Sequence, residues 1–236
     1  ADKLPAWIFL AGLLSIWQLI VVQGWVAPYL LPSPLQIFDT TLEMWPDIFA
    51  ATLSTAQSIL WGLGLSLIIG VSSALLFFSI PIARRAILPF CIFFQTVPII
   101  AIAPLLVIWF GYGQPTVNAS AFIVSLFPIL ANTLTGLQET DPQLKELFRL
   151  YKPSRWQLVF KLQIPSAIPY IITGIKISAG LAVVGAIVGE FIAGGGLGSL
   201  IDAARTQQRV DLVFSGVFMS SALALSLVYT INLMTG

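Results

Sequence analysis

The clearest shortage in this sequence is charge. Of its 236 residues, 9% are charged and 58% are hydrophobic, whereas an average soluble domain carries about 25% charged residues. Because so little polar surface cannot cover a water-soluble globule, the composition predicts an integral membrane protein. The net charge of +1 also argues against nucleic acid as a partner.

Reactive side chains are scarce as well. The sequence contains no histidine, which removes the commonest metal ligand and general base. The one cysteine, Cys91, lies in an apolar run and excludes a disulfide framework. Without clustered acids or a serine–base pair, a membrane-embedded enzyme is disfavoured and no metal site is predicted. The chain also has no Walker motif, so it cannot hydrolyse ATP by itself.

Long uncharged stretches are present instead, and each is a candidate membrane span. A helix needs about 20 apolar residues to cross the hydrocarbon core. A turn at Gly111–Pro115 divides the stretch 86–138 into two spans, and Pro98 and Pro104 are expected to kink the first of them. We expect an all-α transmembrane protein of about six spans, a single domain over 1–236 with a peripheral first span in 1–30 and core spans in 48–236. The other candidates cover about 7–26, 53–80, 167–192 and 212–233, and the prolines at 28, 32 and 34 are expected to end the first.

Basic residues predict how these spans are oriented. Cytoplasmic loops of membrane proteins carry an excess of Lys and Arg. With the N-terminus inside, only Arg205 and Arg209 fall in outer loops, and Lys176 falls within the fifth span. The cytoplasmic segments then hold Lys3, Arg84, Arg85, Lys145, Arg149, Lys152, Arg155 and Lys161. The bias predicts a multi-pass protein whose N-terminus and 139–166 loop are cytoplasmic.

The loop 139–166 is a basic, amphipathic island. Asp141 and Pro142 can start a helix, and Ser154 can cap a second helix that follows Pro153. Between them an apolar stripe recurs at helical spacing, formed by Leu144, Leu147, Phe148 and Tyr151. This pattern fits either a helix resting on the membrane surface or a helix that docks on another protein.

The spacing within the loop resembles the signature of permease subunits of bacterial ABC importers. That signature is Glu-Ala-Ala, three residues, Gly, nine residues, Ile, any residue, Leu-Pro. Glu146 matches the Glu and Pro165 the Pro; Leu147 and Phe148 replace the alanines, and Lys152 replaces the Gly. Leu162 and Ile164 fall on the Ile and Leu.

Further segments resemble the nitrate, sulfonate, taurine and bicarbonate branch of these permeases. They are LPSP at 31–34, the stretches 96–113 and 153–191, and the glycine-rich GGGLG that follows. The resemblance implies a type I ABC importer permease fold with a cytoplasmic coupling helix, in the bacterial plasma (inner) membrane. It does not identify the solute.

The resemblance also implies partners. A second permease subunit, expected to be an identical copy, completes the pathway within the membrane lipid, and ATP-binding subunits lie beneath. A soluble or tethered binding protein delivers solute; ATP and Mg belong to the ATPase, and this chain holds no cofactor. The coupling residues would be Glu146, Leu147, Phe148, Arg149, Tyr151 and Lys152. Lys152 at the Gly position brings the sharp turn into question, and Pro153 is an alternative helix breaker.

Polar residues within the spans are candidates for the pathway. Lys176 and Glu190 share a face of the fifth span, about 21 Å apart along its axis, and intramembrane charges usually face a bundle interior or water. Lys176 would line the inner half and Glu190 the outer gate. Snorkelling and an interfacial position are the respective alternatives. Gln95, Thr96 and Asn132 would line the pore or form helix–helix hydrogen bonds.

These observations predict a permease that couples ATP hydrolysis by a separate subunit to uptake of a small solute, nitrate-, sulfonate- or bicarbonate-like. Lys176 suits an anion. The alternative is an ion-gradient-driven secondary transporter, disfavoured by the short chain, the lack of a repeat and the few intramembrane carboxylates. Residues 194–198 lack the Gly-Lys-Ser/Thr of a phosphate loop and predict a flexible re-entry. Small side chains predict close helix packing at Gly174, Ser178, Gly185 and Gly189.

Overall fold

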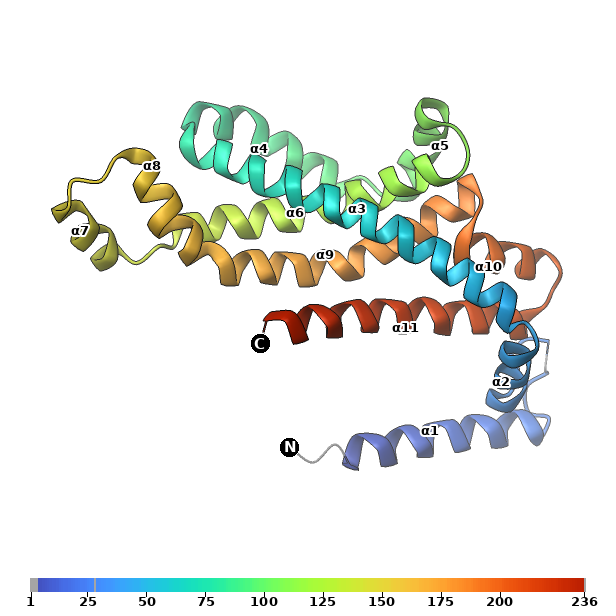
Figure 1. Ribbon diagram of the computed structural model, residues 1–236. Coiled ribbons are helices and arrows are strands. Elements are labelled where there is room, and N and C mark those ends of the chain that lie inside the picture. Colours follow the sequence, from blue (N-terminus) through green and yellow to red (C-terminus); the bar gives the residue numbers. More distant parts are fainter. Residues whose placement is uncertain (1–3, 28, 236) are drawn as a thin grey trace.

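The computed structural model describes residues 4–27 and 29–235, apart from the side chains of Leu4, Ala6, Arg149 and Arg155. Every regular element within these residues is a helix, as expected (Figure 1). The helices are α1 (Leu4–Val22), α2 (Pro34–Glu43), α3 (Trp45–Ser79), α4 (Pro81–Thr96), α5 (Ile99–Phe110), α6 (Gln114–Gln138), α7 (Pro142–Leu150), α8 (Arg155–Leu158), the π-helix η1 (Val159–Gln163), α9 (Ile164–Ala193), α10 (Gly196–Thr206) and α11 (Val210–Thr235).

Four of the described helical segments are long and apolar enough to cross a membrane: α3, α6, Trp156–Ala193 and α11. The pair α4 and α5 makes a fifth if the two count as one span, although the helix axis bends by 105° between them. The first predicted span corresponds to α1, whose apolar part Trp7–Val22 is shorter than the usual crossing length. The structure therefore has four or five long spans and one short apolar helix.

Two proline-dependent predictions had different outcomes. The third span is broken at Val97–Pro98, between α4 and α5, because Pro98 has no N–H to continue the helical ladder. Pro104, in contrast, lies inside α5. The predicted turn before α6 is confirmed, since Gly111 and Gly113 both have positive φ angles.

α1 ends earlier than the prolines suggested. It stops at Val22, and Gly24 follows with φ +74. Pro34 begins a helix instead of stopping one, because Ser33 caps α2 and accepts a hydrogen bond from the Gln36 N–H (3.2 Å). Trp17 brings α1 against α11, with its ring 5.8 Å from that of Phe214.

The core of the bundle consists of α3, α6 and α9, which lie side by side (Figure 1). Small residues allow the helices to approach, as predicted. A Cβ added at Gly185 of α9 would lie 2.7 Å from the carbonyl oxygen of Ser120 on α6, and one at Gly174 would lie 3.0 Å from that of Pro128. On α3, a Cβ at Gly62 would lie 2.6 Å from the Ala121 Cβ. Backbone contact of this kind favours helix association in lipid.

Buried hydroxyls bond the same three helices together. The Ser178 hydroxyl of α9 donates to the Ser125 carbonyl of α6 (2.6 Å), and the Ser66 hydroxyl of α3 lies 2.7 Å from that of Ser125. All three side chains are buried. The core thus combines backbone contact with satisfied polar groups.

The bundle has two distinct ends. Figure 1 shows α7, α8 and the turn between α3 and α4 at one end, hereafter the α7 end. It shows α2, α10 and the turn between α5 and α6 at the other, hereafter the α10 end. The candidate site residues divide between these two ends and the middle of the bundle.

Candidate coupling and transport sites

Helix α7 begins where the sequence predicts. The Asp141 carboxylate accepts the Gln143 N–H (2.8 Å), and its backbone carbonyl accepts the Lys145 N–H (3.0 Å), so Asp141 is the N-cap and Pro142 the first residue. The helix projects beyond the bundle (Figure 1). The chain therefore starts α7 from its own local signals.

The apolar members of the predicted coupling set lie on α7 and directly after it. Leu147 is 55% exposed, Tyr151 is 81% exposed and Glu146 is exposed, while Phe148 is half-buried. The side chain of Arg149 lies outside the described residues. Large apolar groups exposed on a projecting helix are the kind of surface that a partner covers.

Lys152 occupies the turn after α7. Its φ is +48, a left-handed conformation that glycine adopts at little cost. The helix ends at Leu150, two residues before, and Pro153 follows. The sharp turn expected at the Gly position is therefore kept although the residue is a lysine. Pro153 adds a second block to further helix.

The second helix of the loop also starts as predicted. The Ser154 hydroxyl accepts the Gln157 N–H (3.2 Å), and the Gln157 side chain accepts the Ser154 N–H (2.9 Å). This reciprocal pair is a capping box. The helix then runs through η1 into α9 without a gap, so Trp156–Ala193 forms one apolar segment. α8 and α9 are therefore parts of one continuous helical segment.

Glu190 lies at the α10 end and is 1% exposed. Its carboxylate accepts the Thr55 hydroxyl of α3 (2.7 Å) and the Gly198 N–H of α10 (2.8 Å). The Thr55 oxygen in turn accepts the Leu197 N–H (2.9 Å). Glu190 and Thr55 together cap α10 and join it to α9 and α3; we call this set, with Gly196, the α10 lock.

The α10 lock alters the expectation of a flexible glycine-rich re-entry. Gly196 has φ +59, and a Cβ there would collide with the Glu190 carboxylate and the Thr55 hydroxyl. The N–H groups of Leu197 and Gly198 are already bonded. The residues after Gly195 are thus closely packed, and these amides are not open to a phosphate.

Lys176 and Asn132 lie in the middle of the bundle. Both are half-buried. The Asn132 amide donates to the Pro128 carbonyl of its own helix (2.8 Å), and its Cβ would lie 3.2 Å from a Cβ at Gly174. Asn132 therefore faces α9 at Gly174, which lies two residues before Lys176 in the sequence. Lys176 has no described carboxylate within 4.0 Å, since the ion pairs among described residues are Arg205–Asp202 and Arg209–Asp211.

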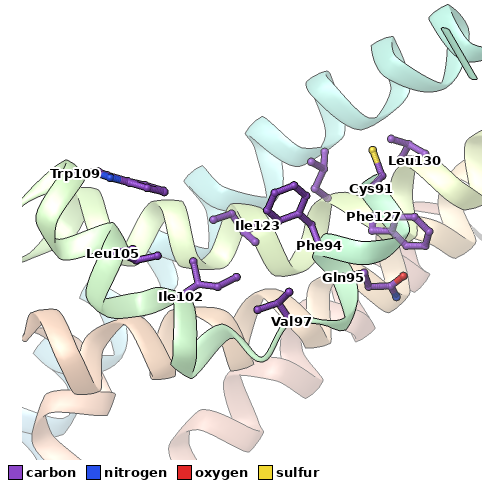
Figure 2. Close-up of a pocket in the computed structure, with 11 residues that line it drawn as sticks. Cys91, Phe94, Gln95, Val97, Ile102, Leu105, Trp109, Ile123, Phe127 and Leu130 are labelled. Carbon is purple, nitrogen blue, oxygen red and sulfur yellow. The ribbon is translucent and has the colours of Figure 1, made fainter. Parts of the chain in front are cut away.

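Gln95 and Thr96 lie at the break between α4 and α5. Both side chains are exposed and line a hollow of about 260 Å³ together with Pro98 and Leu181. Gln95 also lines an adjoining cavity of about 500 Å³ between α4, α5 and α6. Figure 2 shows that its wall is otherwise apolar, with the rings of Phe94, Phe127 and Trp109 around it. The helix break thus exposes two polar side chains beside a cavity.

Thr55 and the aromatic cavity are features that sequence reasoning missed. Thr55 is a single threonine in a long apolar run, and its partners are 135 and 142 residues away in sequence. Phe94, Phe127 and Trp109 lie in apolar runs, where residue type alone does not distinguish a cavity wall from a lipid-facing surface. Only the break at Pro98, which was predicted, pointed to this region.

These features define the class of the protein. The model of the family described as "Binding-protein-dependent transport system inner membrane component" matches residues 62–235. This range includes the second half of α3, all of α6 and α9, the loop 139–166, and Glu190 and Gly196 of the α10 lock. The chain belongs to this family. It is therefore a multi-pass transport permease of the ABC importer type.

Several relatives are similar to this chain over most of their length. The formylaminopyrimidine transport permease of Halalkalibacterium halodurans is 37% identical, over 92% of this chain and 88% of that protein. The riboflavin permease of Chloroflexus aurantiacus is 31% identical, over 91% of this chain and 81% of that protein. The bicarbonate permease of Synechocystis sp. is 30% identical, over 96% of this chain and 85% of that protein.

Proposed function

We propose that this chain forms the solute pathway of an importer and couples ATP hydrolysis by a separate subunit to uptake of a small solute. The observation that carries the proposal is the projecting helix α7, which exposes Leu147 at the position of the family signature and is followed directly by the exposed Tyr151. Family membership favours this importer over an ion-gradient-driven secondary transporter.

Charge reversal on α7 tests the proposal. Glu146→Lys, combined with Phe148→Ala, is expected to abolish ATP-dependent uptake in vesicles while the chain still inserts. Trp156→Ala is the matched control, because Trp156 is also exposed (69%) but lies on α8. If uptake and association with the ATPase both survive the double change, α7 is not the coupling element.

We propose an anion as the solute class. Permeases for bicarbonate and aliphatic sulfonates are among the relatives, and Lys176 supplies a half-buried positive charge without a described counterion. Lys176→Ala should then lower uptake of the anion more than it lowers assembly, and Lys176→Arg should restore uptake. An equal loss of uptake and assembly would assign Lys176 a structural role.

A specific observation favours a second candidate, a heteroaromatic solute. Two of the relatives are permeases named for formylaminopyrimidine and riboflavin, and the cavity in Figure 2 has three aromatic rings in its wall. Phe127→Ala is expected to lower uptake of a pyrimidine and leave uptake of a sulfonate unchanged. If Phe127→Ala lowers uptake of the sulfonate and leaves uptake of the pyrimidine unchanged, the anion is favoured as the solute.

We also propose that two copies of this chain pair in the membrane, that a binding protein delivers the solute, and that the α7 end faces the cytoplasm. The excess of basic residues at this end supports the orientation. A thiol reagent that cannot cross membranes should label Tyr151→Cys only from the cytoplasmic side. Labelling from the outer side alone would reverse the orientation.

A further inference from the structure

A hollow of about 550 Å³ lies along one face of α4 at the α7 end. Its lining residues all belong to α4 and are Pro81, Arg84, Arg85, Leu88, Pro89 and Ile92. Figure 1 shows the start of α4 at the same end as α7 and α8. Ala83 and Leu88 hold this part of α4 against the core cluster that contains Leu137. The hollow is therefore separate from the cavity at the helix break and from α7.

Two positive charges in the lining of the hollow have no counterion among the residues that the structure describes. Arg84 is half-buried and Arg85 is exposed. Neither has a carboxylate of a described residue within 4.0 Å. The ion pairs among the described residues, Arg205–Asp202 and Arg209–Asp211, lie at the α10 end. Both side chains line the same hollow, and guanidinium groups are the donors that bind phosphate oxygens best.

The wall of the hollow changes from charged to apolar along the helix. Arg84, Leu88 and Ile92 are spaced by four residues, so they lie on one face of α4. This face extends about 12 Å from Arg84 to Ile92. Ile92 is 47% exposed, and Ile82 beside the arginines is 80% exposed. A ligand that fits this face has an anionic head and an apolar chain.

We propose that Arg84 and Arg85 bind the phosphate of an anionic phospholipid, whose acyl chain lies along Leu88 and Ile92. Charge complementarity selects an anion, and the apolar wall selects a lipid over a free phosphate. Both arginines lie in the first turns of α4, at the α7 end of the bundle. At this end of a span they would meet the lipid headgroups. The inference rests on the membrane location of the chain and is independent of which solute it carries.

The test uses the full-length permease with its ATPase, reconstituted in equal amounts of phosphatidylglycerol and phosphatidylcholine. Lipids retained after extraction are counted by native mass spectrometry. Arg84→Gln with Arg85→Gln is expected to lower retained phosphatidylglycerol at least about tenfold and leave phosphatidylcholine unchanged. Arg84→Lys with Arg85→Lys should restore most of the retention, which separates loss of charge from loss of fold.

Two further variants show where the lipid binds. Lys145→Gln with Lys161→Gln removes two basic charges at the same end but away from the hollow, and it should not change retention. Ile92→Ser should lower retention by a smaller factor than the arginine pair. Equal losses from the lysine and arginine pairs would overturn the proposal in favour of a general surface charge.

Other occupants give different results. A free phosphate site is indicated if millimolar inorganic phosphate displaces phosphatidylglycerol and Ile92→Ser has no effect. An acidic segment of the ATPase is indicated if the arginine pair releases the ATPase while lipid retention stays the same. Either result would overturn the lipid assignment.

Discussion

Each end of the bundle contains a residue with the left-handed backbone conformation, but the two residues have opposite surroundings. Gly196 at the α10 end has φ +59 and no room for a Cβ, because Glu190 and Thr55 fill that space. Lys152 at the α7 end has φ +48 and is exposed. The same conformation is thus enforced by packing at one end and by the local turn at the other.

The same contrast holds for other groups at the two ends. At the α10 end, Thr40 of α2 donates to Asp211 of α11 (2.8 Å), and the Gly113 N–H donates to the Ala193 carbonyl (2.9 Å). At the α7 end, Leu150 and Tyr151 are 78% and 81% exposed. Hydrogen bonds within this chain therefore join the elements at the α10 end, whereas the α7 end extends into a helix whose apolar groups a partner or the membrane surface can bury.

The largest effect is expected from Gly196→Ala. The new Cβ would collide with the Glu190 carboxylate and add backbone strain, so we expect a loss of about 3 kcal/mol or more in unfolding free energy in detergent. Gly24→Ala is the control, because Gly24 has φ +74 and nothing within 4 Å of an added Cβ. Its cost should be about 1 kcal/mol. Equal costs would show that the α10 lock is not tightly packed.

A smaller loss is expected from Thr55→Val, which keeps the shape of the side chain and removes its hydroxyl. The Leu197 N–H and the Glu190 carboxylate would each lose a buried partner, at about 2 kcal/mol in total. Hydrogen exchange in α10 should also accelerate. Thr52→Val is the control, since its hydroxyl bonds only to the Ile48 carbonyl of its own helix. If hydrogen exchange in α10 is unchanged in Thr55→Val, the Thr55 hydroxyl does not hold the start of α10.

The two ends also differ in how far the sequence predicts them. The start of α7, the capping box at Ser154 and the close approach at Gly185 all follow from local residue types, and the structure confirms them. The α10 lock joins Thr55 to residues more than a hundred positions away. No local pattern can indicate such a pairing, because threonine in an apolar helix usually bonds its own backbone.

The broken span shows a second limit. Pro98 and Pro104 look alike in sequence, yet only Pro98 ends a helix. A proline inside a span is tolerated where neighbouring helices accommodate the bend, and that depends on packing. The roles assigned to Gln95, Thr96, Asn132, Lys176 and Glu190 in transport likewise depend on the assembled pathway, so they stay predictions.

At the α7 end, Leu147→Ala with Phe148→Ala restores the residues of the family signature. We expect little change in the stability of the permease, because Leu147 is 55% exposed and Phe148 half-buried. Binding to its own ATPase should weaken about tenfold, since two apolar anchors are lost. Co-purification and titration of the ATPase measure this. Unweakened binding would show that these bulky residues serve no matched groove.

The smallest effect is expected from Lys152→Gly, which also restores the signature. Lysine at φ +48 costs about 1 kcal/mol relative to glycine. The substitution should therefore favour the observed turn by that amount and slow hydrogen exchange in the residues that follow. Because Lys152 is exposed, the only other loss is its charge, which Lys152→Asn controls, since asparagine also tolerates this conformation. If glycine accelerates exchange while asparagine does not, the turn is held by the lysine side chain and not by the backbone.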